Sequence, residues 1–582
     1  MNRTRRLFSL GLALCLVLTT LCLGGCKKQQ QEPEALDDTQ AEPAAAAYAG
    51  KLFDTSRVHT VDVAISEADW ADLRANPTKK TKYEADLTVD GETFRSVSFA
   101  TKGNTSMSAV AMSDSDRYSF KINFGKFVDG QTYYGLDKLN LNNVYADATY
   151  MKDFLSYEIF RQAGVDAPLV SYVWLTVNGA DHGLYIAIEE VGESWLDRTN
   201  AGQGQLYKPE TEQLDNDNMG NMPEGGQMPQ NGERPEMPEG GQMPQMPQNG
   251  ERPEMPEGGQ MPQMPQNGER PEMPEGGFPG GMPGQGGFQP PENGEAPQMP
   301  GGQGGPGGFG GSAKGADLVY SDDSLESYSD IFDNCETDAE DGDKQRVVSA
   351  LKALSEGRTD SLDTDEVIRY FAAHNLVLNY DSYTGNLLHN YYLMESGGKL
   401  SMLPWDYNLA FGGFGMGGDA TQLINTGIDT PLSGAQAEAR PMWSWIAASE
   451  EYLQQYHAVY DELLKGYFES GKCEAQIEAL REMIAPYVEK DPTAFYTADE
   501  FQTAVDALKR FCALRAESIR AQLSGALAAD TQAQDAAKRV DASDLDVKAM
   551  GTHGGPEGKG DRGDRKEPDA APAADSGPTA AT

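Results

Sequence analysis

Three oxygen-bearing side chains lie at spacings that suit a divalent cation and an activated hydroxyl group. Asp381 precedes Asn386 by five residues in "NYDSYTGN", and Asp406 follows in the apolar stretch "LPWDYNLAF". Transfer of a phosphoryl group from ATP needs Mg²⁺, a cation near the phosphates and a carboxylate beside the acceptor hydroxyl, and protein kinases space an Asp, an Asn and a second Asp in this way. The spacing predicts Asp381 as the catalytic carboxylate and Asn386 and Asp406 as metal ligands.

The pattern from Asp381 to Asn386 occurs often by chance, so its surroundings matter. Tyr392 to Leu403 can form a hairpin that turns at "ESGGK" and ends just before Asp406. Two features of ordinary kinases are missing, because no G-x-G-x-x-G precedes the candidate phosphate-binding Lys and Asn379-Tyr380 stands where His-Arg is usual. Phosphoryl transfer by this chain would therefore need other elements to bind the phosphates and to hold Asp381.

The strand "DRYSFKINF" is the first of these elements, because it carries Lys121 opposite an apolar face made by Tyr118, Phe120, Ile122 and Phe124. A helix follows in "DATYMKDFLSYEIFRQAG", with Gly164 as its stop. We predict Lys121 as a phosphate-contacting cation and Glu158 as its acidic partner, with Asp153 as the second choice. The alternative is an ordinary exposed Lys on an edge strand.

The loop "TKGNTS" is the second element that could contact phosphates. Its backbone N–H groups and the side chains of Lys102, Gly103 and Asn104 could cover them in place of a glycine-rich loop. A simple turn explains the same residues equally well.

The chain around these motifs divides into six predicted segments. Residues 51–208 read as strands, one helix and two more strands joined at Asn178-Gly179, and residues 316–527 read as mainly helical. Between them, residues 211–315 contain the repeat "GGQMPQMPQNGERPEMPE" twice in succession and are predicted to be a disordered insertion. Its Met residues could bind Cu(I), but neither His nor Cys accompanies them, so a flexible loop expanded by repeat slippage is favoured. Residues 528–582 are predicted to be a disordered tail.

The N-terminus predicts export. Residues 1–26 combine three Arg, an apolar run and the small residues before Cys26, as in a signal peptide, and "LGGC" resembles the lipobox of bacterial lipoproteins. We expect lipidation of Cys26 followed by a polar tether at 27–50; a transmembrane anchor is the alternative, although the apolar run is short for a span. Cys335, Cys473 and Cys512 remain, and they indicate neither a disulfide framework nor a zinc site.

Composition limits the partners. The chain has 582 residues, 90 acidic against 47 basic side chains and a net charge of −43. This charge disfavours a nucleic-acid partner, because binding to phosphate backbones needs clustered Lys and Arg. The acidic stretch "DNCETDAEDGD" at Asp333–Asp343 could indicate a Ca²⁺-stabilised adhesin, but its spacing is not that of a Ca²⁺ loop, and a solvated helix N-terminus is favoured.

Seven blocks of the sequence, in order, resemble the CotH family of spore-coat-protein-H-like atypical protein kinases. They are "FATKGNTS", "RYSFKINF", "YMKDFLSYEIFRQAGVDAP", "VNGADHGLYIAIEEVGESWL", "QLYK", "NYDSYTGNLLHNYYL" and "LPWDYNLAFGG". The similarity covers roughly 58–208 and 316–527.

The resemblance implies an α+β, kinase-like fold of two lobes, with a β-rich N-lobe carrying one helix and a mainly helical C-lobe. It also implies ATP, Mg²⁺ or Mn²⁺, and transfer to Ser or Thr of secreted, envelope or spore-coat proteins. By position, Asp381 corresponds to the catalytic Asp and Asp406 to the metal-binding Asp, with Asn386 as a second metal ligand and Lys121 and Glu158 as the ion pair. The competing interpretation is a non-catalytic, lipid-anchored protein that uses the same fold to bind envelope or coat partners.

Overall fold

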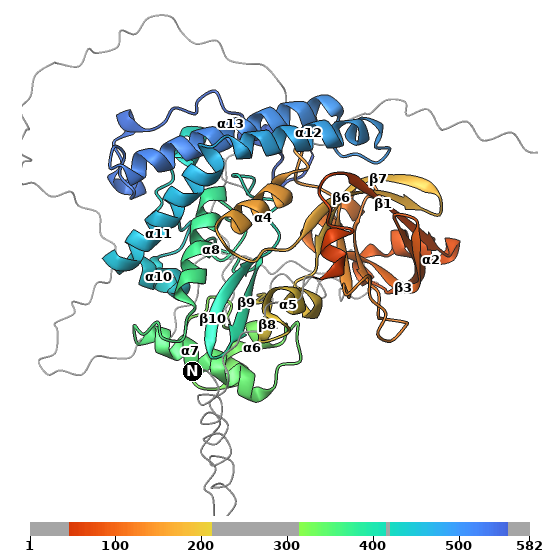
Figure 1. Cartoon of the computed structure of the whole chain (residues 1–582), viewed down its shortest axis with the longest axis horizontal. Helices are drawn as coiled ribbons and strands as arrows, with labels where there is room; N and C mark the ends of the chain where they lie inside the picture. The colour runs from red at the N-terminus through yellow and green to blue at the C-terminus, as the bar shows by residue number, and fades with distance from the viewer. Residues whose placement is uncertain (1–45, 212–313, 415–418, 557–582) are drawn as a thin grey trace, which may run out of the picture. The chain divides into compact units, whose positions relative to one another are not determined.

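The computed structural model describes residues 46–211, 314–414 and 419–556, all of which belong to one compact unit. The predicted signal peptide with Cys26, nearly all of the predicted tether and nearly all of the predicted insertion lie outside the described residues. The mixed α+β class is confirmed, with a β-rich N-terminal region and a mainly helical C-terminal region (Figure 1).

Seven strands of the N-terminal region close into a barrel in the order β1-β2-β3-β4-β5-β7-β6. Only β1 and β6 run parallel; every other neighbouring pair is antiparallel. Apolar side chains fill the interior, and the rings of Phe99 and Phe120 stack with centroids 4.6 Å apart. The strands are β1 (Val58–Ile65), β2 (Tyr83–Val89), β3 (Glu92–Lys102), β4 (Ser119–Asn123), β5 (Lys138–Asn142), β6 (Val170–Val177) and β7 (Ala180–Glu189).

Two predicted hairpins are confirmed, and both depend on left-handed backbone. Asn178 and Gly179, with φ of 52° and 78°, connect β6 to β7. Gly397 and Gly398, with φ of 59° and 83°, connect β9 (Tyr391–Ser396) to β10 (Lys399–Pro404). Because glycine and asparagine tolerate this conformation, both turns were visible in the sequence.

The predicted helix after β4 is confirmed as α4 (Lys152–Gln162), but the prediction of one helix in this region is wrong. Three further helices occur, and each has at most nine residues, too few to show a clear apolar period. They are α2 (Glu67–Ala75), α3 (Thr105–Ala111) and α5 (Glu193–Asn200).

A second, three-stranded sheet joins the two sides of the undescribed segment 212–313. β8 (Gln205–Tyr207) precedes that segment, and β9 follows it, yet the two strands pair antiparallel with Tyr207 opposite Leu393. The N-terminal and C-terminal regions are therefore parts of one folded unit.

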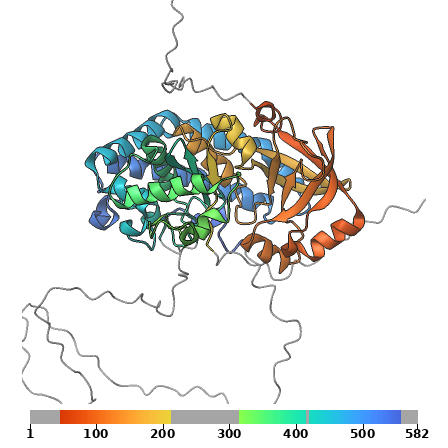
Figure 2. The same cartoon turned by 90° about the horizontal axis from the view of Figure 1, so that it is seen from below.

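Helices dominate after residue 314. α12 and α13 lie side by side along the top of the unit in Figure 1, and α12 also contacts β7 of the barrel. The view from below in Figure 2 shows the barrel strands at the opposite end of the unit from most of the other C-terminal helices. The helices are α6 (Ser329–Phe332), α7 (Asp341–Ser355), α8 (Thr364–Val377), α9 (Ala420–Ile424), α10 (Pro441–Ala447), α11 (Glu450–Leu463), α12 (Lys472–Lys490) and α13 (Ala498–Leu523).

Residues 528–556 depart from their prediction as part of a disordered tail, and the rest of that predicted tail, 557–582, lies outside the described residues. Residues 528–556 are described, and Ala542, Leu545 and Met550 are buried, with a short 3-10 helix at Val547–Met550. The sequence did not predict this ordered segment, because a few apolar side chains spread over a polar stretch show neither helical nor strand periodicity.

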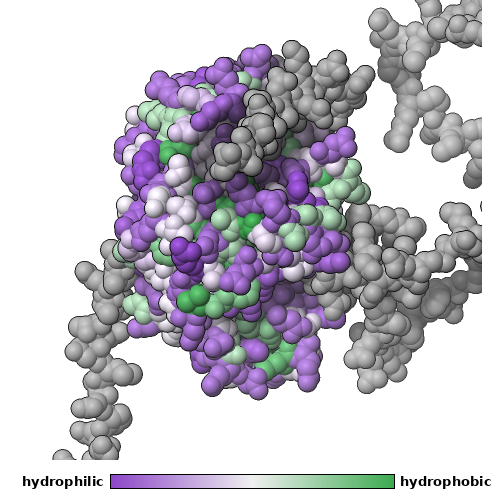
Figure 3. Space-filling view, turned by 90° about the vertical axis from the view of Figure 1, so that its right-hand side faces the viewer, coloured by the Kyte–Doolittle hydropathy of each residue, from purple (hydrophilic) through white to green (hydrophobic). Residues whose placement is uncertain are grey.

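The structure also describes the three remaining cysteines, the acidic stretch before α7 and the surface. Cys335, Cys473 and Cys512 are free thiols. The acidic stretch before Asp343 leads into α7, where Glu340 and Asp343 form a capping box, so the prediction of a helix N-terminus is confirmed. The face in Figure 3 is mainly hydrophilic where it is coloured, in keeping with the acidic composition. In the described part of the chain no helix has the length and apolarity needed to cross a membrane.

Candidate active site

A cavity of about 490 Å³ opens where the barrel meets the segment around β9 and β10. Its size is in the range usual for small-molecule sites. Six lysines line it although the chain is strongly acidic, and four carboxylates from distant segments lie among them. The charged lining residues are Lys80, Lys82, Lys102, Lys121, Lys138, Lys208, Glu190, Glu210, Asp381 and Asp406.

Lys121 points out of the barrel because its neighbours Phe120 and Ile122 point in. Its Nζ lies 2.7 Å from Oε1 of Glu190, the residue that follows β7, and Asn140 donates a hydrogen bond to the other oxygen. Burial raises the pKa of Glu190, but the charge and hydrogen bond of Lys121 outweigh burial and bring this pKa to about 2. The site thus contains a charged Lys–Glu pair.

The predicted partner of Lys121 was wrong. Glu158 lies on α4, outside the cavity lining, where Arg161 binds it at 3.2 Å and Gln162 at 2.8 Å. The choice followed the order of elements in ordinary kinases, whereas here the acidic partner follows a strand. Glu190 stands in "AIEEVG", a stretch in which the sequence alone does not distinguish one Glu from the other.

The loop predicted to cover phosphates does line the cavity with Lys102, Gly103 and Asn104. Lys102 donates to Asn142 at 2.8 Å, and its Nζ lies 5.4 Å from the ring centroid of Trp405. Burial lowers the pKa of Lys102, and the nearby carboxylates of Asp406 and Glu190 oppose that shift. Gly103 has a φ of 95°, which favours glycine, so the loop can turn sharply beside Lys102.

Asp381 lies in the loop after α8 and faces the same cavity. His389 Nε2 lies 2.7 Å from its Oδ1, and Asn390 donates to its Oδ2 at 3.1 Å and to its backbone oxygen at 2.8 Å. His389 and Asn390 also line the cavity, and neither was predicted. Two neighbours therefore fix the direction of this carboxylate.

Asn386, predicted as a metal ligand, is not brought to this cavity. It is exposed, and its side chain lies close to Gly434 instead. Residues 381–390 form an irregular loop rather than a helix, so the five-residue spacing does not place Asp381 and Asn386 on a common face.

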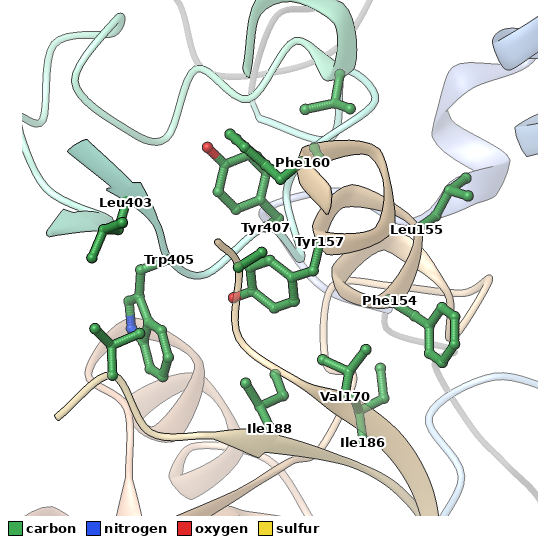
Figure 4. Close-up of a cluster of buried hydrophobic side chains, with 14 of the residues drawn as sticks. Phe154, Leu155, Tyr157, Phe160, Val170, Ile186, Ile188, Leu403, Trp405 and Tyr407 are labelled. Carbon is green, nitrogen blue, oxygen red and sulfur yellow. The ribbon is translucent and has the colours of Figure 1, made fainter. Parts of the chain in front are cut away.

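Asp406 is the second residue after β10, and its backbone is left-handed with a φ of 55°. Two side chains of α4 hold this backbone. The N–H of Asp406 donates to the hydroxyl of Tyr157 at 3.1 Å, and the N–H of Tyr407 donates to Oδ1 of Asp153 at 2.8 Å. Figure 4 shows Tyr157 between α4 and the segment carrying Trp405 and Tyr407. A non-glycine residue in this conformation costs about 1–3 kcal/mol, so the two hydrogen bonds help to maintain it.

The carboxylates near Asp406 influence one another. Burial raises the pKa of Asp406, the charge of Asp381 raises it further, and Lys102 opposes both. Burial, with the Asp406 charge, likewise raises the pKa of Asp153 to about 7. A cation placed between these groups would relieve the repulsion.

The donor set fits a hard divalent cation shared with phosphate. Among the described residues no group of three or more His, Cys, Asp or Glu could hold a metal alone. Mg²⁺ needs only one or two carboxylates when phosphates and water complete its shell, and Asp406 and Asp381 both face the cavity. Lysines with carboxylates in one cavity are suited to a nucleoside triphosphate with its metal.

Comparison with known proteins agrees with this chemistry. The family model described as CotH kinase protein matches residues 99–242 and 310–519, more than half of the chain. The inner spore coat protein H of Bacillus subtilis (strain 168) is 26% identical over 172 residues, which are 28% of this chain and 43% of that protein. An inner spore coat protein H-like protein of the same organism is 34% identical over 87 residues, which are 14% of this chain and 27% of that protein. The match thus spans less than half the length of each of these curated relatives.

Proposed function

Because the chain belongs to the CotH kinase family, we propose that it is an atypical protein kinase that transfers the γ-phosphate of ATP to Ser or Thr. The observation that carries this proposal is the meeting of Lys102, Lys121, Asp381 and Asp406 in one cavity. The barrel and the helical region would then correspond to the two lobes of a kinase. Secreted, envelope or spore-coat proteins are the proposed acceptors, since the relatives are named as spore coat proteins.

Each side chain has a proposed task. Lys121, oriented by Glu190, and Lys102 bind the phosphates, and the loop with Gly103 and Asn104 covers them. Asp406 holds Mg²⁺ or Mn²⁺, which neutralises charge on the phosphates. Asp381, oriented by His389 and Asn390, accepts the proton of the acceptor hydroxyl. Neither Glu158 nor Asn386 has a task in this scheme.

The transfer step uses these groups in order. The acceptor hydroxyl approaches the γ-phosphorus and gives its proton to Asp381. A bond forms between that hydroxyl oxygen and phosphorus, and the bond from phosphorus to the oxygen bridging it to the β-phosphate breaks. ADP leaves with that bond's electron pair, and Lys102 and Lys121 stabilise the charge that develops on it.

We also propose that the protein acts outside the cytoplasm, held to the membrane by a lipid on Cys26. This rests on the "LGGC" motif and the preceding apolar run, which lie outside the described residues. Loss of labelled palmitate from a Cys26→Ala variant would test the anchor.

The test of catalysis is transfer from γ-labelled ATP by the chain from Lys27 onward, with Mg²⁺ or Mn²⁺. We expect label on the protein or on a generic acceptor, and none with Asp406→Ala. Asp544→Ala, an exposed Asp outside the cavity, is the matched control and should behave as the wild type. No label in the wild type, together with no shift of its melting temperature by ATP, would favour a non-catalytic binding protein instead.

A further inference from the structure

The C-terminal segment Asp546–Pro556, here called the C-terminal strap, crosses beside the cavity. The oxygen of Met550 accepts from the N–H of Ala148 at 3.2 Å, and the N–H of His553 donates to the oxygen of Gly413 at 3.0 Å. The strap therefore contacts two segments, the loop after β5 and the chain that follows Asp406.

The strap is fixed at its base by a buried cation. Lys152 is fully buried at the start of α4, and its Nζ donates to the oxygens of Ala146 and Gly551 at 3.3 and 3.1 Å. Gly551 has a φ of 87°, and a Cβ there would lie 2.5 Å from the oxygen of Ala146. Met550 is also fully buried. These contacts make the strap a fixed part of the wall.

His553 extends from this base into the lining of the cavity. The Phe414 ring meets it edge-on, with centroids 5.5 Å apart. Tyr145, Asn408 and Leu409 line the cavity too; the Tyr145 hydroxyl donates to the oxygen of Gly554 at 3.3 Å.

His553 lines the cavity together with residues that closely follow Asp406 in the chain. Asn408 and Leu409 are the second and third residues after Asp406, and Asn408 also lines a small adjoining hollow with Lys102 and Asp406. His553 is exposed, so its ring nitrogens are accessible to a ligand. His553 lines the same cavity as Lys102 and Asp406, and an imidazole N–H there can donate a hydrogen bond to a phosphate oxygen.

We propose that the C-terminal strap completes the pocket and that His553 is a further binding residue, which donates a hydrogen bond to the phosphate chain of the bound nucleotide. This inference rests on the proposed function, because it assumes that the pocket takes a nucleoside triphosphate. It adds a residue that lies outside the region matched by the family model, which ends at 519.

The experiment compares binding of ATP and of adenosine to the full-length chain with Mg²⁺, by competition against a labelled ATP. We expect His553→Ala to weaken ATP binding roughly five-fold, the effect of one ordinary hydrogen bond, and to leave adenosine binding unchanged. Lys548→Ala, an exposed strap residue outside the cavity lining, is the matched control and should bind both as the wild type does. Chains ended after Thr552 and after Pro556 provide a second pair, and only the first should lose ATP affinity.

The outcomes separate the two proposals. If the wild type binds no ATP, the proposed function fails and this inference fails with it. If the wild type binds ATP and His553→Ala binds it equally well, only the inference is overturned. An equal loss of ATP and adenosine affinity would also overturn it, because that result describes a strap that supports the wall without contacting phosphate.

Discussion

Two ion pairs of the barrel differ in how completely their charges are satisfied. Arg117 and Asp491 are fully buried and 2.8 Å apart, and the guanidinium also binds Thr493 and the backbone oxygens of Asn143 and Leu184. In the Lys121–Glu190 pair the lysine side chain is 38% exposed, and among the described residues Glu190 is its one hydrogen-bond partner.

This difference in exposure and hydrogen bonding distinguishes an ion pair that stabilises the fold from one that can also bind a ligand. The Arg117 side chain is fully buried and each of its three nitrogens already has a hydrogen-bond acceptor, and its pair with Asp491 ties the barrel to the end of α12. Lys121 keeps donors that point toward an open cavity, and Glu190 fixes its position. Charge near a cavity is therefore a weaker sign of function than charge whose hydrogen-bonding capacity is left unused.

The largest expected effect comes from breaking the buried pair. Asp491→Ala leaves Arg117 buried without its counter-charge, and we expect the free energy of unfolding to fall by about 3–5 kcal/mol. Lys121→Met should lose ATP binding with a smaller loss of stability, because Glu190 keeps its hydrogen bond from Asn140 and can take up a proton. Urea unfolding of both variants measures the difference, and equal losses would mean that Lys121 is structural too.

The next effect concerns transfer. Asp381→Ala should keep ATP binding but lower the transfer rate by about 10²–10⁴-fold, because no other carboxylate is held at its position to take the proton. Single-turnover measurements separate binding from the chemical step. An unaffected transfer rate would reject Asp381 as the base.

Acid should weaken the pair in the cavity. The pKa of Glu190 is held at about 2 in the folded protein, below its ordinary value of 4.5. Its contribution to stability is therefore complete above pH 4.5 and is lost as pH falls toward 2, with a total on the order of 3 kcal/mol. Glu190→Gln should flatten the pH dependence of the unfolding free energy in this window, whereas a curve parallel to the wild type would contradict the pKa assignment.

A smaller effect is expected where α4 holds Asp406. Tyr157→Phe removes the hydroxyl that accepts from the Asp406 N–H, at a cost of about 1–3 kcal/mol. The left-handed backbone at Asp406 then loses one of its two hydrogen bonds to α4, so the proposed metal ligand is held less firmly. We therefore expect half-maximal transfer to need a higher Mg²⁺ concentration. An unchanged Mg²⁺ requirement with reduced stability would show that Tyr157 only packs.

The smallest effects distinguish two asparagines near Asp381. Asn390→Ala removes two hydrogen bonds to Asp381 and should lower the transfer rate several-fold. Asn386→Ala, at the exposed position, should change it less than two-fold. A strong loss with Asn386→Ala would restore its predicted role as a metal ligand.

The sequence predicted the features that depend on local pattern. The alternating face of β4 placed Lys121 outside the barrel, Asn178-Gly179 and Gly397-Gly398 indicated the two hairpin turns, and Asp406 comes two residues after β10. Each of these follows from neighbours in the chain.

The features that the sequence did not predict depend on contacts between residues that are far apart in the chain. Glu190 meets Lys121 through the pairing of β4 with β5 and of β5 with β7, and His553 reaches the cavity only after α13. Neither position has a local signal. The three short helices α2, α3 and α5 were not predicted, because helices of so few residues show no clear apolar period.

The two ends of the repeat-bearing stretch meet at one residue. The N–H of Glu210 donates to the backbone oxygen of Asp330 at 3.0 Å, and the N–H of Lys314 donates to the Asp330 carboxylate at 2.9 Å. The sequence predicts a disordered stretch between these two fixed ends, and for a connection of that kind doubling the length adds only about 0.6 kcal/mol of closure entropy. On that prediction, a change in the number of repeat copies should leave the folded unit and its pocket unaffected.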